Sequence, residues 1–433
     1  MRAHRGRFAV VAGVMALATA LTAAACGGSN DNGGGGGNGT TTLHINTFGV
    51  FGYKEAGLYA AFEASHPGVK IVESVSEYND HHNALVNHLA AGSGAADIEG
   101  VDEGFVAQFK SEPNLFANLL DLGASSRKAD YPAAKWNAFL SPDGSKQLGL
   151  GTDVGGLAMC YRTDLFQKAG LPTDPAAVSA LWPTWDQFFT TGGKFRDANT
   201  GATFFDAGQN IYNAQMFQQS EAYYKTGTED VIVGTNPAVK KAWDNTMTAI
   251  GDNLSGKLVP FADDWTTAMK QGKFATLTCP AWMAGYIKTN APETKGLWNV
   301  ATIPGGSGNW GGSWLVIPAQ SKNQKLAYEL MDFLTKPENQ VKVFKAVGNM
   351  PSTIGAVNDA TVQGFTDPFF NNAPTGKIFG ESALKLVPQY QGPKHGAIRQ
   401  AIEEHGIQLV EQGKADPDTA WKDALTEAER AAR

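Results

Sequence analysis

The fold is decided by residues 43–101, which contain LHINTF (43–48), KEAGLYAAFEASHPG (54–68), VKIVESV (69–75) and ADIEGV (96–101). Apolar and polar residues alternate in 43–48 as in a strand, and Leu58, Tyr59 and Phe62 then share one helical face. Residues 69–75 predict a second strand and 96–101 a third, with a helix between them that Asp80 can cap and Gly92 can end. This alternation predicts an α/β fold with a mainly parallel sheet covered by helices.

The same alternation continues through the rest of the chain. Residues 155–162 (GGLAMCYR) predict a strand before the helix 163–170, and Thr184 and Gln187 fit a capping box at the start of the helix in 181–195. Residues 273–282 (KFATLTCPAW) and 311–318 (GGSWLVIP) are further strand candidates, and 323–340 and 395–414 are amphipathic helices. The stretch from Leu43 to Arg433 is too long for one ordinary domain, so we expect two lobes.

The N-terminus has the pattern of a secretory signal. Arg2, Arg5 and Arg7 precede an uncharged stretch, which predicts a signal peptide over residues 1–25. The segment LTAAAC (21–26) resembles a bacterial lipobox, which implies a lipid on Cys26, although Ala23 stands where Leu is usual. Residues 26–42 are rich in Gly and predict a flexible tether that holds the folded part away from the membrane.

Charge and cysteine content narrow the possible partners. Removal of residues 1–25 lowers Lys and Arg from 35 to 32 against 42 Asp and Glu, a net charge of about −10. This charge argues against nucleic acid and anionic lipid as partners. Besides Cys26, only Cys160 and Cys279 are present, and two thiols outside the cell are more often paired than free; two separate buried thiols are the alternative.

Motifs of enzymes and metal sites are weak in this sequence. No G-x-S-x-G, H-E-x-x-H or S-x-x-K set occurs in a supporting context, so we expect no catalytic residues and keep an exported hydrolase only as an alternative. Walker and dinucleotide glycine loops are absent, and we expect no cofactor. His81 and His88 are seven residues apart, about 10 Å along a helix, which is too far for one metal ion. We interpret them, with His82, as a solvated helix surface.

A series of short motifs, taken in order, resembles the family-1 extracellular solute-binding proteins, the group that includes maltose-binding protein. The motifs cover nearly the whole chain after the tether and include AFEASHPGVKI (61–71), CYRTDLFQKAGLP (160–172), MKQGKFATLTCPAWMAGY (269–286), GNMPS (348–352) and GKADPDTAWKDAL (413–425). The resemblance implies a monomer that captures a ligand outside the cell and delivers it to an ABC import permease. Sugar is favoured over polyamines, phosphate esters or iron, because the chain has ten Trp for stacking on sugar rings.

The resemblance also implies how the chain is divided. Residues 43–152 and 313–350 are expected in the first lobe, and 153–312 and 351–433 in the second. The chain is expected to cross between lobes near 149–157, 304–312 and 348–352, so that ligand binds in the cleft and closure desolvates it. Because the family places the strands of Cys160 and Cys279 in one sheet, we expect a disulfide between them.

Candidate ligand residues follow from the family positions and from the chemistry of sugars, whose apolar faces need aromatic platforms and whose hydroxyls need planar acceptors. Trp282 matches a cleft Trp of the family, and Trp310 and Trp314 flank the second crossover; core packing is the alternative for each. Asp153, where the chain leaves the first lobe, matches a cleft carboxylate of the family and is expected to accept sugar hydroxyls; the other candidates are Trp265, Asp102, Glu103, Tyr78 and Asn79. Of Asp102 and Glu103, which follow a strand, we expect one to face the cleft and the other to be solvated.

Overall fold

The computed structural model describes residues 40–433. The expected signal peptide, Cys26 and the tether up to residue 39 lie outside this range. The first strand, β1 (Thr41–Phe48), begins inside the segment assigned above to the tether: Thr41 pairs with Val69 and Thr42 with Lys70. The tether prediction is therefore wrong for these two residues, because β-branched Thr fits a strand as well as it fits a polar linker.

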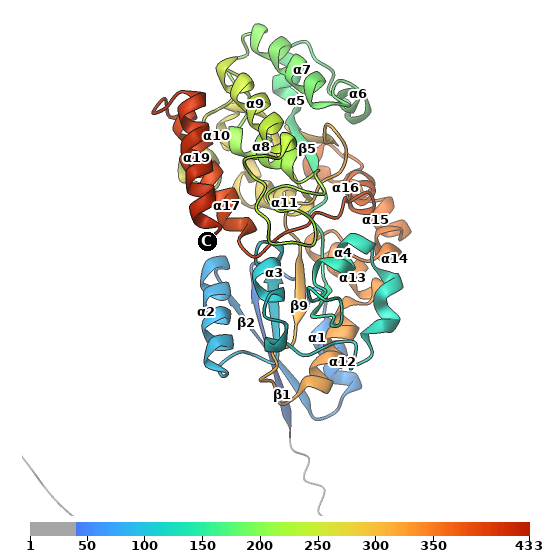
Figure 1. Cartoon of the computed structure of the whole chain (residues 1–433). Helices are drawn as coiled ribbons and strands as arrows, with labels where there is room; N and C mark the ends of the chain where they lie inside the picture. Colours follow the sequence, from blue (N-terminus) through green and yellow to red (C-terminus); the bar gives the residue numbers. More distant parts are fainter. Residues whose placement is uncertain (1–39) are drawn as a thin grey trace, which may run out of the picture. The chain divides into compact units, whose positions relative to one another are not determined.

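The first sheet contains five strands in the order β2-β1-β3-β9-β4. β1 is parallel to β2 (Val69–Ser76) and to β3 (Ile98–Asp102). β9 (Ser313–Val316) lies antiparallel between β3 and β4 (Gly149–Gly151), although it follows both by a long stretch of sequence. The lower half of Figure 1 shows this sheet with helices on either side; β3 lies between β1 and β9.

The second sheet contains four strands in the order β6-β7-β5-β8. β5 (Ala158–Arg162) is antiparallel both to β7 (Phe274–Cys279) and to β8 (Trp298–Thr302), and only β6 (Thr203–Phe205) is parallel to its neighbour β7. The α/β class with two sheets flanked by helices is confirmed, but the expectation of a mainly parallel sheet is wrong here. Alternating strands and helices imply parallel strands only when strands that follow each other in the sequence are also neighbours in the sheet. The neighbours of β5 are β7 and β8, which come much later in the chain.

Helices cover both sheets and end at ordinary stop signals. The capping box predicted at Thr184 and Gln187 is confirmed. No helix within residues 40–433 is long and apolar enough to cross a membrane. The helices are α1 (Leu58–Ser65), α2 (Tyr78–Ala91), α3 (Glu103–Lys110), α4 (Ala133–Ala138), α5 (Thr163–Lys168), α6 (Pro175–Ser179), α7 (Trp185–Asp197), α8 (Gly208–Met216), α9 (Pro237–Gly251), α10 (Asp263–Gln271), α11 (Ala281–Asn290), α12 (Gln324–Thr335), α13 (Pro337–Val347), α14 (Ile354–Val357), α15 (Ala360–Gln363), α16 (Thr375–Leu384), α17 (His395–Ile402), α18 (Gln408–Glu411) and α19 (Pro417–Ala431).

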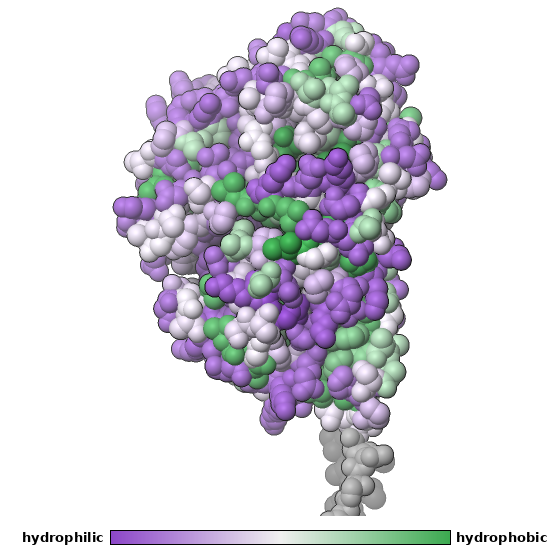
Figure 2. Space-filling view, turned by 90° about the vertical axis from the view of Figure 1, so that its right-hand side faces the viewer, coloured by the Kyte–Doolittle hydropathy of each residue, from purple (hydrophilic) through white to green (hydrophobic). Residues whose placement is uncertain are grey.

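Three segments that pass between the two sheets are hydrogen-bonded to one another. The Val154 N–H donates to the carbonyl of Met350 at 3.1 Å, and the Trp310 N–H donates to the carbonyl of Gly155 at 2.9 Å. Only glycine fits at position 155, because the Cβ atom of any other residue would lie 1.8 Å from the Trp310 carbonyl oxygen. On the face shown in Figure 2, apolar atoms gather at mid-height between two more polar halves.

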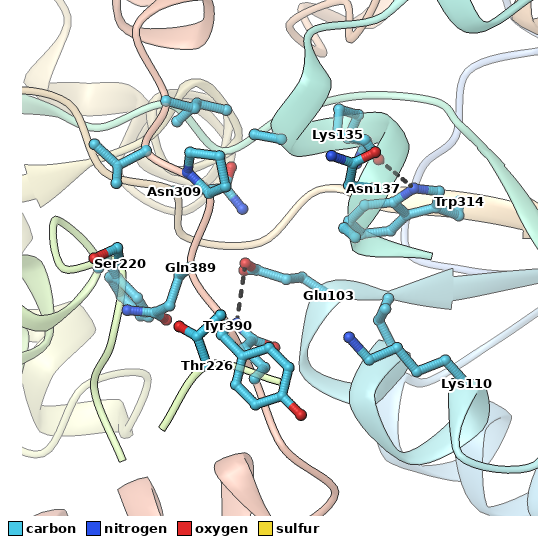
Figure 3. A pocket seen from close by; sticks show the side chains of 18 residues that line it. Glu103, Lys110, Lys135, Asn137, Ser220, Thr226, Asn309, Trp314, Gln389 and Tyr390 are labelled. Atoms are coloured by element: carbon cyan, nitrogen blue, oxygen red, sulfur yellow. Dashed lines mark hydrogen bonds between the residues drawn. The ribbon is translucent and has the colours of Figure 1, made fainter. Parts of the chain in front are cut away.

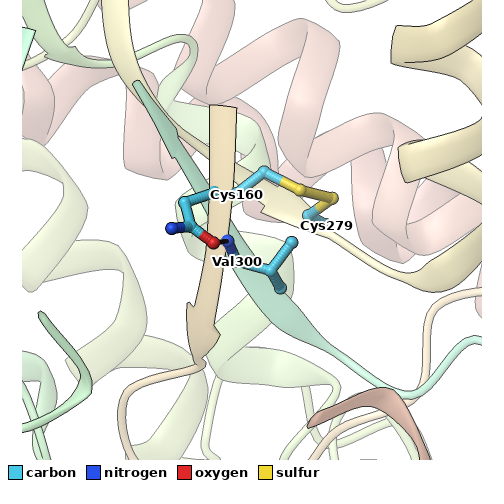
Figure 4. Close-up of a disulfide and its surroundings, with 4 residues drawn as sticks. Cys160, Cys279 and Val300 are labelled. Carbon is cyan, nitrogen blue, oxygen red and sulfur yellow. Dashed lines mark hydrogen bonds between the residues drawn. A yellow bond between two sulfur atoms is a disulfide. The ribbon is translucent and has the colours of Figure 1, made fainter. Parts of the chain in front are cut away.

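Cys160 and Cys279 form a disulfide in the second sheet, with 5.4 Å between their Cα atoms. The two residues are not directly opposite each other: Cys160 pairs with Leu277 and Cys279 with Ala158, so the bridge runs diagonally between β5 and β7. Figure 4 shows the bridge with Val300 of β8 on the neighbouring strand. Both cysteines are fully buried, so the disulfide is part of the core of this half.

Candidate ligand-binding site

A cavity of about 330 Å³ lies at the junction of the two halves. Its walls are α3 and α4 beside the first sheet, and the segments that follow α8 and α16 in the second half (Figure 3). Three of the residues that line it are charged, and most of the others are amides, hydroxyls or aromatic rings. The lining residues include Glu103, Lys110, Lys135, Asn137, Phe217, Ser220, Thr226, Asn309, Trp314, Gln389, Tyr390 and Gln391.

The end of β3 positions the acidic pair predicted from the sequence. Asp102 is the N-cap of α3 and accepts a hydrogen bond from the Gly104 N–H at 2.9 Å. The same carboxylate oxygen accepts from the Tyr78 hydroxyl at 2.8 Å, and burial raises the pKa of Asp102. Glu103 therefore lines the cavity, while Asp102 is held in the helix cap, is half-buried and does not line the cavity. Asn79, one residue after Tyr78 on α2, is exposed and does not line the cavity.

Glu103 connects the cavity to the crossover segments. Its Oε2 atom accepts from the Gly311 N–H at 2.9 Å, and its Oε1 atom accepts from Gln391 Nε2 at 3.3 Å. Burial raises the pKa of Glu103 to about 7, while the hydrogen bonds from the protein oppose that shift. Both carboxylate oxygens of Glu103 already have donors from the protein.

The tryptophans predicted from the sequence fall in three different places. Trp314 borders the cavity, but its side chain is 1% exposed and packs in the core, and the Lys135 ammonium lies 3.1 Å from the centroid of its ring. Trp310 and Trp282 are half-buried and pack against each other, with ring centroids 5.0 Å apart. They reach the cavity through Phe217, which lines it and stacks on Trp310 with centroids 6.2 Å apart.

Trp265 is a core residue, which contradicts its interpretation as a ligand residue. Its side chain is fully buried, and its indole N–H donates to Asp206 Oδ2 at 2.8 Å. The position before a helix suggested an exposed ring, but the hydrophobic cluster beneath α10 takes it in. Asp153 lies in the first crossover, where its Oδ1 accepts from the Ser313 N–H at 2.9 Å and from Thr152 Oγ1 at 2.8 Å. It does not line the cavity.

The two neighbouring histidines of α2 are buried, so their interpretation as a solvated surface is wrong. His81 and His82 are 4% and 0% exposed, and His82 accepts from the Asp102 N–H at Nε2 and donates to the Tyr78 carbonyl at Nδ1. This pattern fixes a neutral imidazole, and burial lowers the pKa of His82 to about 4. Within residues 40–433, no group of three His, Cys, Asp or Glu could hold a metal ion.

Several cavity residues were not found by sequence reasoning. Lys110 and Lys135 lie on short amphipathic helices and carry no signal that separates them from surface lysines. Tyr390 stands between Gln389 and Gln391 in a proline-flanked loop, PQYQGP (388–393), and this aromatic among polar residues was a usable signal. Phe261 does not line the cavity, but it is 46% exposed and stacks on Trp282, and its φ of +69° is an unusual backbone conformation for a bulky residue.

Comparisons with known proteins agree with this geometry. The family model for bacterial extracellular solute-binding proteins matches residues 57–371. A crystal structure of a family-1 extracellular solute-binding protein is 40% identical with a TM-score of 0.86, covering 90% of this chain and 100% of that one. An arabinooligosaccharide-binding protein of Bacillus subtilis is 26% identical over 307 residues, 65% of this chain and 66% of that protein.

The fold also matches that of the galacto-N-biose and lacto-N-biose I-binding protein of an ABC transporter from Bifidobacterium longum, solved with lacto-N-biose. That structure is 19% identical with a TM-score of 0.74, covering 91% of this chain and 97% of that one. The match of the family model over most of the folded part, together with the 40% identical structure, leads to one conclusion. The chain belongs to the bacterial extracellular solute-binding proteins.

Proposed function

We propose that this protein captures a sugar or an oligosaccharide in the cavity between its two halves and delivers it to an ABC import permease. The observation that carries the proposal is the composition of the cavity wall, which combines the ring of Tyr390 with amides and hydroxyls such as Asn137 and Ser220. Aromatic rings suit the apolar faces of sugars, and planar polar groups suit their hydroxyls. The relatives named for arabinooligosaccharides and lacto-N-biose point the same way.

The protein binds its ligand without converting it. The one carboxylate that lines the cavity, Glu103, is held by Gly311 and Gln391, and a facing second carboxylate at the spacing of a glycosidase pair does not line this cavity in the described part of the chain. The family is one of binding proteins, and an exported hydrolase would need both groups.

The protein works outside the cytoplasm, as its family does. We propose that residues 1–25 are removed on export and that a lipid on Cys26 holds the protein at the outer face of the membrane. The folded part acts as a monomer, with residues 43–152 and 313–350 in one lobe and 153–312 and 351–433 in the other. Closure of these lobes on ligand presents the surface that the permease recognises.

The proposal is tested by a thermal-shift screen over mono- and oligosaccharides, because a ligand that binds only the folded state raises the melting temperature. We expect at least one sugar to raise it and Tyr390→Ala to reduce that rise, since Tyr390 lines the cavity. Phe365→Ala removes an aromatic ring outside the cavity and is the matched control. An absence of response to every sugar in a broad panel contradicts the proposal.

A further inference from the structure

Basic residues outnumber acidic residues on the cavity wall. Two ammonium groups, of Lys110 and Lys135, face one carboxylate, of Glu103. The protein as a whole has the opposite sign, with 42 acidic against 35 basic residues. Two further carboxylates, of Asp102 and Asp153, lie near Lys135 without lining the cavity, so the excess of basic groups is confined to the cavity wall itself.

Glu103 does not neutralise the two lysines by direct contact. Its carboxylate oxygens accept from the Gly311 N–H at 2.9 Å and from Gln391 Nε2 at 3.3 Å. The helix cap holds Asp102 in a similar way, through Tyr78 and Gly104. The carboxylates near the cavity are therefore engaged by protein donors.

Lys135 is a buried cation without a hydrogen-bond acceptor. Its side chain is 4% exposed, and its Nζ atom makes no hydrogen bond with any residue from 40 to 433. The ring of Trp314 lies 3.1 Å below the ammonium and satisfies part of its charge. Burial lowers the pKa of Lys135 to about 7, while Asp153, Glu103 and Asp102 attract the proton from a distance. Burial of an ammonium group without a hydrogen-bond acceptor costs free energy, and a bound ligand that supplies an acceptor removes part of this cost.

Lys110 supplies the second cation from the same side of the cavity. Lys110 is the last residue of α3, and Lys135 lies on α4, the next α-helix in the chain. Its ammonium lies 5.7 Å from the centroid of the Tyr390 ring, and Figure 3 shows it pointing from α3 toward that ring. Burial lowers the pKa of Lys110, and no charged partner offsets this effect.

We propose that the ligand of this cavity is an acidic sugar, one that carries a carboxylate or a phosphate group, and that Lys135 and Lys110 bind the anionic group. This inference rests on the proposed sugar-binding function and narrows it. Tyr390 and the amides of the wall bind the sugar ring, and the anion takes the place of the acceptor that Lys135 lacks. A charge-assisted hydrogen bond to a buried ammonium is stronger than one between neutral groups.

The test uses pairs of sugars that differ only in charge. Galacturonic acid is compared with galactose, α-1,4-linked digalacturonic acid with α-1,4-linked galactobiose, and glucose 6-phosphate with glucose. Calorimetry measures each affinity for the wild type, for Lys135→Met and for Lys110→Met. Lys241→Met changes an exposed lysine of α9 outside the cavity and is the control. The first two pairs report on a carboxylate and the third on a phosphate.

We expect the acidic member of at least one pair to bind tenfold or more tightly than its neutral partner, and the preference to weaken at high salt. Lys135→Met is expected to lower the affinity for that acid by about tenfold or more, with the affinity for neutral sugars nearly unchanged. Lys110→Met is also expected to lower the affinity for the acidic sugar, and this variant replaces Lys135→Met in the test if that variant does not fold. Lys241→Met is expected to bind as the wild type does.

Neutral sugars that bind as tightly as their acidic partners in every pair overturn this inference and leave the proposed function intact. If none of the six compounds binds, the inference is overturned for these sugars. The proposed function is then tested by itself, by measuring binding to a broad panel of neutral oligosaccharides. Equal loss of affinity for acidic and neutral sugars in Lys135→Met also overturns the inference, because it shows a role in packing rather than in binding charge.

Discussion

The indole N–H of Trp282 donates to the backbone carbonyl of Trp310, with 2.8 Å between Nε1 and the oxygen. Trp282 lies on α11 and Trp310 in the second crossover, so the bond joins a helix of the second half to the segment between the sheets. Trp310 in turn stacks on Phe217 in the cavity wall. Trp282 therefore acts on the cavity through Trp310 and holds that ring in place.

Trp282→Ala is expected to weaken the binding of the best sugar by roughly 2 kcal/mol or more, the range of a buried aromatic hot spot. The physical reason is the loss of both the hydrogen bond and the ring against which Trp310 packs. Isothermal calorimetry measures the change. Trp421→Ala, at a half-buried Trp that packs on Trp243 away from the cavity, is expected to leave affinity unchanged. An unchanged affinity in Trp282→Ala removes this residue from the binding site.

Loss of the Cys160–Cys279 disulfide is expected to lower the free energy of unfolding by about 2–4 kcal/mol, because the bridge closes a long loop in the unfolded chain. Urea unfolding of the wild type with and without reductant measures this change. The double variant Cys160→Ala, Cys279→Ala is the control and should not respond to reductant. Recovery of both cysteines as free thiols from exported protein contradicts the prediction.

Cys26 is expected to carry a diacylglyceryl group at the N-terminus of the processed protein. Mass spectrometry of the membrane fraction detects this group, and Cys26→Ser should release the protein from the membrane. Protein that keeps residues 1–25, or that is found unmodified in the medium, goes against the assignment.

The contribution of two buried carboxyl groups to stability is expected to fall as pH rises from 5 to 8. Glu99 is 1% exposed, and burial raises its pKa from 4.5 to about 7; Glu411 is shifted in the same direction. Between pH 4.5 and 7 the folded state therefore holds more protons than the unfolded state, and the stability that they contribute is lost as pH rises through 7. Each such carboxyl contributes on the order of 2–3 kcal/mol.

Glu99→Gln tests this pH dependence, because the amide keeps the acceptor for the Ala96 N–H and cannot ionise. Urea unfolding at pH 5 and pH 8 should show a smaller difference for the variant than for the wild type. His81 Nε2, 3.9 Å from Glu99 Oε2, is the facing titratable group, and burial keeps it neutral by lowering its pKa. Equal pH dependence in both proteins shows that Glu99 does not control it.

Much of the fold could be predicted because its signals are local. The alternation in 43–48, the helical face of Leu58 and Phe62, and the cap at Thr184 are all readable within a few residues. The pairing of Cys160 with Cys279 needed the resemblance to a family, because no local pattern reports which strands are neighbours. Strand direction in the second sheet was missed for the same reason.

The cavity was harder to predict than the fold. Glu103 was found because it follows a strand, but Lys110 and Lys135 became cavity residues only through the packing of α3 and α4 near the crossovers. Trp265 and the histidines of α2 show the opposite error. A long-range hydrogen bond, to Asp206 for Trp265 and from the Asp102 N–H for His82, makes burial favourable, and neither partner can be identified from the neighbouring sequence.

The position of β9 sets the order in which the chain can fold. β9 is made about 210 residues after β3 ends, and it is the only partner that β4 has in the first sheet of the described chain. Until Val316 has emerged, β3 has an open edge and β4 has no place to pair, so the first half cannot mature while synthesis continues. Folding of the first half is therefore coupled to completion of the chain, because a contact between residues far apart in the sequence has to form before this sheet is complete.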